Sequence, residues 1–385
     1  MSTKIKNSLL LVLGLTVAAA AILIGLAFVG GSGSASPQPA TKMSGPWRSI
    51  PNGPEPIAAG RVSVWTGTEM IVAGINPGSV GTFVHSTEVA QSYNPATRTW
   101  LRLATPPATP SFCRRSAVWT GDKMLVWGCG LLAFDAAKNE WSRLQDPPTG
   151  QGIVAWTGRE LIGWGGGCCG DVSDDGSAYN PETNTWRKLA PAPVGGQQSP
   201  AGAWTGHELV ILSGRSPDGD HVDGAAYNPS TDTWRRIASV PAPYEAAQAF
   251  AYGDKLFVLG TRTGYASLLE LDVKTNRWHD LGSVGRTPGE AVLAGNQLIV
   301  LAGEAAHADG FSYYFATGAR VPFTVPSFAR GVDQALVWTG RHLLVWGGMV
   351  PTQTHASKPP AYLASGAVFS PQKVSPPLPQ CCGGG

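Results

Sequence analysis

Two arginines and a glutamate occupy corresponding positions in a repeated pattern, and their side chains suggest the clearest chemistry in this sequence. A short phrase, Trp-Thr-Gly or a degraded version of it, opens each repeat. Four positions before each opening stand Arg61, Arg115, Gly152, Pro200, Gln248, Glu290 and Gln334. Two guanidinium groups in neighbouring repeats would suit a carboxylate or a sugar acid. We therefore predict a ligand-binding set of Arg61, Arg115, Gln248, Glu290 and Gln334, and arginines that merely line the rim are the alternative.

The repeats themselves indicate how these side chains are positioned. Trp-Thr-Gly begins at Trp65, Trp119, Trp156, Trp204 and Trp338, and degraded versions occur at Tyr252 and Ala294. A second phrase, Tyr-Asn-Pro-x-Thr-x-Thr-Trp or a variant, ends at Trp100, Trp141, Trp186, Trp234 and Trp278. A period of roughly 40–50 residues with four short strand patterns per unit is typical of a β-propeller. The sequence thus predicts an all-β fold with seven blades, in which the predicted site lies at the mouth of the central channel.

The second phrase predicts a turn between the third and fourth strands of a blade. An Asn or Asp stands six residues before the closing tryptophan, as in Asn94 and Trp100. Such a side chain accepts a hydrogen bond from the backbone two residues later and starts the turn. We expect the threonine three residues after the Asx, such as Thr97, to satisfy further backbone groups.

The two ends of the repeat region complement each other. Trp47 lies before Trp65 at the spacing that separates other closing tryptophans from the next opening, whereas the last repeat lacks a closing tryptophan. We predict that the strand containing Trp47 completes the last blade, which would remove an open sheet edge.

The pattern resembles the kelch repeat, in particular the bacterial kelch and galactose-oxidase central-domain type of propeller. The resemblance rests on the glycine doublets Gly165-Gly166 and Gly347-Gly348 and on the Tyr-Asn-Pro…Trp turn. Blade six departs from it, because Tyr314 and Arg320 replace the Asx and the tryptophan. The resemblance implies the propeller fold and no single activity.

Composition and the N-terminal sequence bear on location. Charged residues make up 14% of the chain and the net charge is +2, without a basic stripe, so nucleic-acid binding is not expected. Lys4 and Lys6 precede an uncharged apolar stretch from Leu9 to Val29, which matches the length of a bilayer span. We expect residues 1–30 to be a membrane anchor or signal sequence, 31–45 a linker, 46–372 the propeller and 373–385 a Pro-rich tail. The propeller would be a monomer on the extracytoplasmic side of the cell membrane, or secreted or periplasmic if the signal is cleaved.

The six cysteines fit an oxidising compartment. Cys113 and Cys129 stand either side of the turn at Gly121, so we predict a disulfide across the first hairpin of blade two. The connectivity of the adjacent pairs Cys168-Cys169 and Cys381-Cys382 stays open, and their spacing is unlike that of zinc ligands.

Histidine is the other residue type with potential site chemistry. His85, His221, His307 and His355 fall in the expected loops between second and third strands, but no spacing motif unites them, so we assign no metal and no cofactor. The favoured function is a binding or scaffold module for a protein, a carbohydrate polymer or a small acidic ligand. The alternative is a sugar-acid epimerase or mutarotase-like enzyme with Glu290 as proton carrier, and no catalytic residue is assigned.

Overall fold

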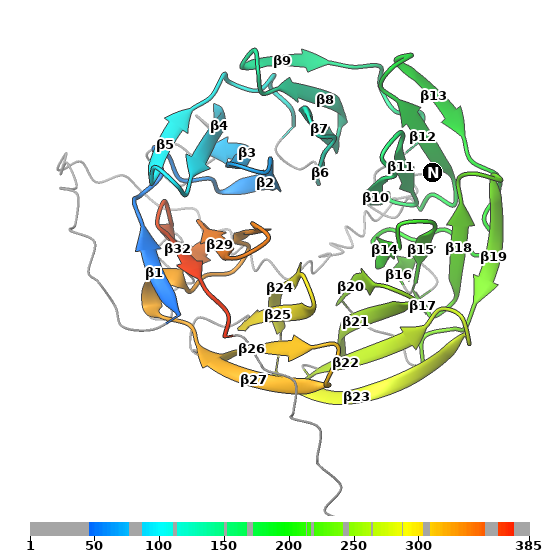
Figure 1. Cartoon of the computed structure of the whole chain (residues 1–385). Coiled ribbons are helices and arrows are strands. Elements are labelled where there is room, and N and C mark those ends of the chain that lie inside the picture. Colours follow the sequence, from blue (N-terminus) through cyan, green and yellow to red (C-terminus); the bar gives the residue numbers. More distant parts are fainter. Residues whose placement is uncertain are drawn as a thin grey trace, which may run out of the picture.

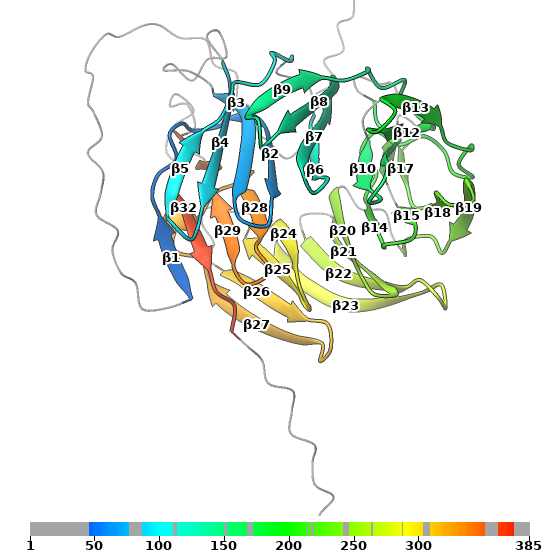
Figure 2. The same cartoon turned by 45° about the horizontal axis from the view of Figure 1, so that its top comes forward.

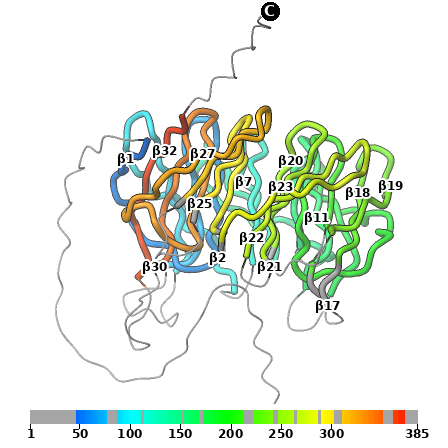
Figure 3. Tube along the Cα trace, turned by 90° about the horizontal axis from the view of Figure 1, so that it is seen from below, coloured from blue at the N-terminus to red at the C-terminus, as the bar shows by residue number. Residues whose placement is uncertain are grey.

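The computed structural model describes residues 46–76, 87–110, 114–149, 152–167, 172–212, 214–216, 219–241, 246–262, 265–286, 288–302, 309–350 and 361–372. Within these residues, seven four-stranded antiparallel sheets form the blades of a propeller, as the repeat predicted. Figure 1 shows the blades around a common axis, and the innermost strands contact one another in a closed ring. Figure 3 shows the disc edge-on, with the blades packed side by side.

The first four blades follow one another along the chain. Blade 1 contains β2 (Ala59–Trp65), β3 (Met70–Asn76), β4 (Thr87–Asn94) and β5 (Thr99–Arg102). Blade 2 contains β6 (Ser116–Trp119), β7 (Lys123–Gly128), β8 (Gly130–Asp135) and β9 (Glu140–Arg143). Blade 3 contains β10 (Ile153–Trp156), β11 (Leu161–Trp164), β12 (Gly176–Asn180) and β13 (Thr185–Lys188). Blade 4 contains β14 (Gly202–Trp204), β15 (Leu209–Ile211), β18 (Gly224–Asn228) and β19 (Thr233–Ile237).

The remaining blades complete the ring. Blade 5 contains β20 (Ala246–Tyr252), β21 (Lys255–Arg262), β22 (Tyr265–Asp272) and β23 (Arg277–Arg286). Blade 6 contains β24 (Pro288–Ala294), β25 (Gln297–Ala302), β26 (Asp309–Tyr314) and β27 (Ala319–Thr324). Blade 7 contains β28 (Ala335–Trp338), β29 (Leu343–Trp346), β32 (Gly366–Phe369) and β1 (Trp47–Ile50). Outside the blades lie the short pairs β16 (Gly214–Ser216) with β17 (Gly219–His221) and β30 (Met349–Val350) with β31 (Ala361–Tyr362), and the 3-10 turn η2 (Ser327–Ala329).

The predicted closure of the ring is confirmed. Strand β1 pairs with β32 in antiparallel register, so that Trp47 faces Phe369. Figure 2 shows β1 and β32, from opposite ends of the chain, side by side in one blade. Trp47 is 4% exposed, and its ring lies 4.7 Å from that of Phe369, centroid to centroid. The N-terminal strand therefore belongs to the hydrophobic core of the last blade.

The closing tryptophans of blades 1 to 5 also hold the preceding blade by a hydrogen bond. The indole N–H groups of Trp141, Trp234 and Trp278 donate to the carbonyls of Ala104, Ala190 and Ala238 at 2.8, 2.8 and 3.0 Å. The amide N–H groups of the same three alanines donate to Asn139, Asp232 and Asn276, two residues before the tryptophans. One residue of each preceding blade is thus held at both its N–H and its C=O, an arrangement we call the blade clamp.

The clamp explains which residues adopt a left-handed backbone. Asn139, Asp232 and Asn276 have φ between 52° and 56°, a conformation that Asn and Asp tolerate better than most residues. In blade 1 the clamped residue is Pro51, whose carbonyl accepts from Trp100. Because proline has no N–H to satisfy, Arg98 can stand at the clamp position there (φ 59°) without providing an acceptor.

The turns between third and fourth strands confirm the predicted Asx role and correct the threonine role. Asn94 Oδ1 accepts from the backbone N–H of Ala96 at 2.9 Å, and Asn180 and Asn228 do the same two residues later. The expectation that the threonine hydroxyls bond to backbone was wrong for three blades. Those hydroxyls pair with the hydroxyl of the threonine two residues later, as Thr97 does with Thr99 at 2.6 Å. The Asn side chain already accepts from the turn's N–H groups.

Blade 6 replaces the tryptophan clamp with an arginine. Arg320 donates to the carbonyls of Ser283, Leu281 and Gly282 in the outer strand of blade 5. The departure from the repeat thus keeps the hydrogen bond to the preceding blade and loses the indole ring.

The described residues include no helix that is both long and apolar enough to cross a membrane. The expected anchor and linker, residues 1–45, and the expected tail, 373–385, lie outside the described residues.

Candidate functional site

The site is built on the innermost strands, where each predicted residue stands near the start of its strand. In β2, a bulge between Ala59 and Val62 and a left-handed Gly60 (φ 56°) interrupt the pairing with β3 just before Arg61. In β24, a second irregularity between Pro288 and Ala291 contains Glu290. Bulges re-aim side chains and are common beside active sites. Arg61 and Glu290 are therefore both carried by distorted segments of inner strands.

Arg61 has a buried guanidinium that is poorly satisfied. Its side chain is 3% exposed, and Nη2 donates to the carbonyl of Ile57. Neither Nε nor Nη1 has a hydrogen-bond acceptor within the described part of the chain. The nearest carboxylate is that of Asp333, whose Oδ2 lies 3.7 Å from Nη1 and whose side chain is 70% exposed. Burial lowers the pKa of Arg61, while Asp333 and Glu290 favour its charged form.

Glu290 carries an unusual carboxyl group in the same cluster. Burial, with a smaller contribution from Asp333, raises the pKa of Glu290 to about 8, although Arg61 and the backbone N–H of Gln334 both stabilise its charged form. At neutral pH the group therefore retains its proton in a large fraction of molecules. A carboxyl group of this kind can donate a hydrogen bond or exchange a proton near neutral pH.

Two further residues join this cluster that the sequence pattern did not single out. Asp333 stands immediately before Gln334 and adopts a left-handed backbone (φ 58°). Tyr362 of β31 interacts electrostatically with Arg61 and Asp333, and burial raises the pKa of its hydroxyl. The sequence could have indicated Asp333, because this acidic residue directly precedes the predicted site residue Gln334. Nothing in the repeat indicates Tyr362. We call Arg61, Glu290, Asp333, Gln334 and Tyr362 the inner-strand cluster, which joins blades 1, 6 and 7.

The two predicted glutamines have supporting positions. Gln334 donates its side-chain amide to the carbonyls of Ala329 and Gly347, at 3.2 and 3.3 Å. Gln248 of blade 5 donates to the carbonyl of Gly289 and accepts from the N–H of Ala291, at 3.1 and 3.2 Å. Gln248 thus holds the backbone on both sides of Glu290 and fixes the position of that carboxyl group.

Arg115 lies in a separate arrangement. Its Nη1 and Nη2 donate to the two carboxylate oxygens of Glu88, at 2.9 and 2.5 Å, and Nη2 also reaches Thr109. Both side chains are buried, with 5% and 6% exposure. The structure therefore brings Arg61, Glu290 and Gln334 together, with Gln248 behind Glu290, while the Arg115 charge is paired with Glu88.

The other predicted groups fall largely outside the described residues. These are Cys113, Cys168, Cys169, Cys381, Cys382, His85, His307 and His355. Cys129 lies exposed in the turn between β7 and β8, and its pairing with Cys113 stays a prediction. No three His, Cys, Asp or Glu side chains of the described residues are grouped so that they could hold a metal ion.

Comparison with known proteins agrees with the fold. Residues 165–193, which run from the glycine doublet after β11 through β12 and β13, match the Kelch motif. No curated protein matches the sequence. The glycine doublet, the Asx turn and the closing Trp186 of this blade are the features on which the sequence resemblance rested. This chain is a seven-bladed β-propeller that contains a kelch motif.

Proposed function

We propose that this propeller is an extracytoplasmic binding module and that the inner-strand cluster takes the carboxylate of a small acidic ligand, in particular an acidic sugar. The observation that carries the proposal is Arg61, a buried guanidinium with two nitrogens that lack acceptors in the described part of the chain. Leaving a buried donor unsatisfied costs about 1–3 kcal/mol, and more for a charged group. A ligand carboxylate would recover this free energy.

The neighbours of Arg61 support such an exchange. Asp333 is mostly exposed and lies beyond hydrogen-bond distance of Nη1, so its carboxylate can move aside at little cost. Glu290, with a pKa of about 8, is neutral often enough at pH 7 to donate its O–H to the second oxygen of a ligand carboxylate or to a sugar hydroxyl. The cluster then offers one fixed positive charge and one neutral donor.

Titration of the full chain with glucuronate, followed calorimetrically, tests this function. We expect saturable binding that glucose, which lacks the carboxylate, does not reproduce. Arg61→Gln should weaken binding at least about tenfold, the loss expected for one charged hydrogen bond. Asp333→Asn should strengthen it, because Asn removes the competing charge and tolerates the left-handed backbone.

Arg341→Gln, in an exposed turn of blade 7, is the matched control and should bind as the parent does. Three results would each refute the proposal. They are equal binding of glucose, unchanged binding by a folded Arg61→Gln variant, and no saturable binding at about 10 mM glucuronate. At that concentration a binding free energy of only about 3 kcal/mol is detectable.

The proposed location rests on the N-terminal sequence alone. Lys4 and Lys6 before the apolar stretch from Leu9 to Val29 favour an anchor with the propeller outside the cell membrane. Protease added to cells whose outer layers have been removed should then digest the propeller, and alkaline carbonate should leave the full chain in the membrane fraction. Protection from protease would contradict this location.

A second candidate, a sugar-acid epimerase or mutarotase-like enzyme, is favoured by one observation. Glu290 has a pKa close to neutral pH beside a positive charge, as a general acid–base group requires. Magnetisation exchange between the two anomers of glucuronate would be faster with the protein than with Glu290→Gln if this is correct. Equal exchange rates with the parent and with Glu290→Gln would contradict the enzymatic function and leave binding as the proposed function.

A further inference from the structure

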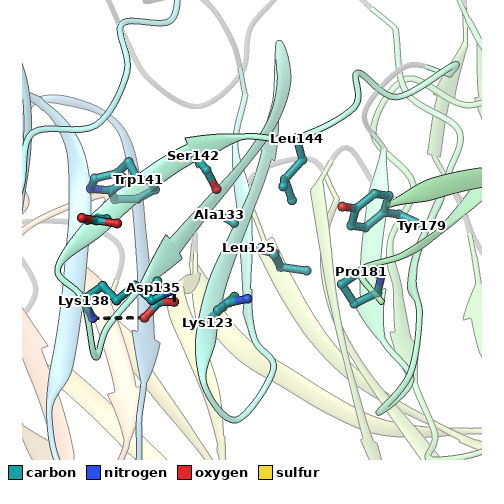
Figure 4. Close-up of a pocket in the computed structure, with 11 residues that line it drawn as sticks. Lys123, Leu125, Ala133, Asp135, Lys138, Trp141, Ser142, Leu144, Tyr179 and Pro181 are labelled. Carbon is teal, nitrogen blue, oxygen red and sulfur yellow. Dashed lines mark hydrogen bonds and ion pairs between the residues drawn. The ribbon is translucent and has the colours of Figure 1, made fainter. Parts of the chain in front are cut away.

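A groove of about 230 Å³ lies between blades 2 and 3, away from the inner-strand cluster. Figure 4 shows that Leu125, Ala133, Ser142 and Leu144 of blade 2 face Tyr179 and Pro181 of blade 3 across it. Lys123 lies at one end of the groove, and Asp135 with Lys138 at its side. Its walls are therefore part apolar and part charged.

The next interface, between blades 3 and 4, shows one way in which the corresponding space is filled. Between blades 3 and 4, Arg187 follows the closing tryptophan and pairs with Ala178 across the sheet. Its guanidinium donates to both carboxylate oxygens of Glu160, at 3.1 and 2.7 Å, and to Tyr227 Oη of blade 4 at 3.1 Å. In blade 2 the residue after the closing tryptophan is Ser142, which pairs with Ala133. The groove therefore has a serine where the next blade has the arginine that spans its interface.

The charge at the end of the groove is also reversed. Lys123 stands directly before Met124, as Glu160 stands before Leu161 in blade 3. Arg187 is paired with Glu160, whereas no ion pair of Lys123 is formed among the described residues; the nearby acid Asp135 is paired with Lys138 at 3.4 Å. The groove therefore presents an ammonium group where the filled interface has a carboxylate.

The tyrosine of the filled interface has a counterpart in the blade 3 wall of the groove. Tyr179 corresponds to Tyr227 and donates to Asn184 at 2.7 Å, as Tyr227 donates to Asp232 at 2.6 Å. At the filled interface the tyrosine oxygen additionally accepts from Arg187. In the groove Tyr179 has no such arginine partner among the described residues, and its side chain is 1% exposed because it packs with Leu125 and Ala133.

We propose that the groove between blades 2 and 3 is a second binding site, for a small carboxylic acid with an apolar body. The carboxylate accepts from Lys123 Nζ and the apolar body lies on Leu144 and Pro181, whereas Leu125 and Tyr179, each 1% exposed, lie beneath the accessible surface of the groove. An N-acylated amino acid has both features, and the groove volume suits a ligand of that size. Glu140, which also lines the groove, disfavours a second negative charge on the ligand.

Calorimetric titration of the full chain with N-acetyl-leucine tests the site. We expect saturable binding, and N-acetyl-leucine amide, which lacks the carboxylate, should bind at least about tenfold more weakly. Lys123→Gln should show the same loss. The double variant Lys123→Glu with Ser142→Arg copies the ion pair of blade 3 and should abolish binding by filling the groove.

Two controls separate this site from others. Lys274→Gln changes an exposed lysine that pairs with Asp254 in the corresponding region of blade 5 and should leave binding unchanged. Arg61→Gln should also leave it unchanged, since the inner-strand cluster is a different site. The melting temperature of each variant shows that it is folded.

Three results would overturn the proposal. They are equal binding of the acid and its amide, binding that persists in the folded double variant, and no saturable binding at about 10 mM. If the double variant does not fold, Lys123→Gln alone decides the matter.

Discussion

Arg115 Nη1 lies 2.9 Å from Glu88 Oε2 in a buried, two-pronged ion pair between blades 2 and 1. Breaking a buried pair leaves one uncompensated charge, which typically costs about 3–5 kcal/mol. Glu88→Gln should therefore lower the free energy of unfolding by roughly that amount in denaturant titrations. Replacing both residues, by Glu88→Leu with Arg115→Met, should recover much of the loss. A single variant as stable as the parent would show that this pair contributes little.

The blade clamp makes a second prediction. Asn276→Ala removes the acceptor for the N–H of Ala238 and places alanine in a left-handed backbone, so it should destabilise by about 1–3 kcal/mol. Arg98→Asn is the informative counterpart, since Pro51 has no N–H and Asn relieves the left-handed strain at φ 59°. We expect Arg98→Asn to match or exceed the parent in thermal melts. A strong destabilisation by Arg98→Asn would contradict the clamp.

The repeat pattern predicted the elements that each blade forms for itself. The hairpins, the Asx turns and the closing role of Trp47 follow from residue spacing, because each depends on short-range backbone geometry or on a missing strand. The partners of individual side chains could not be read in this way. Nothing about Arg115 reveals that Glu88, in the preceding blade, neutralises it, since that contact depends on how two blades pack.

The candidate site was predictable in part for the same reason. Position within the repeat placed Arg61 and Glu290 on inner strands, but the bulges that carry them depend on pairing with β3 and β25. The groove between blades 2 and 3 was in principle visible in the sequence, as Ser142 aligned with Arg187. It becomes meaningful only when Tyr179 is seen to form the opposite wall.

Glu290 should make stability depend on pH. Its pKa is raised from the ordinary 4.5 to about 8, so between these values the folded protein binds a proton that the unfolded chain has lost. Stability from this group is complete below about pH 4.5 and is lost as pH rises toward 8. Glu290→Gln mimics the protonated form. The melting temperature of this variant, compared with that of the parent at the same pH, should therefore increase as pH rises from 5 to 8.

The exposed Glu182→Gln is the control for that comparison and should show no such trend. A constant difference between Glu290→Gln and the parent across this range would contradict the raised pKa. Affinity for glucuronate should fall above about pH 8 as well, because ionised Glu290 would repel the ligand carboxylate.

Ring closure makes a final prediction. Trp47→Ala removes a side chain that is 4% exposed and packed on Phe369, and should cost about 3–5 kcal/mol. Leu101→Ala, in the outer strand of blade 1 and 61% exposed, should change stability by less than about 0.5 kcal/mol. Guanidinium denaturation of both variants checks the difference, and equal losses would contradict a closing role for Trp47.

The pairing of Trp47 with Phe369 has a consequence for biosynthesis. The ribosome makes β1 first and its partner β32 last, and at about 5–20 residues per second the interval is on the order of tens of seconds. During that time a strand with two apolar residues, Trp47 and Ile50, has no sheet to join. The nascent chain therefore exposes this apolar strand, an aggregation-prone surface, until the final blade emerges.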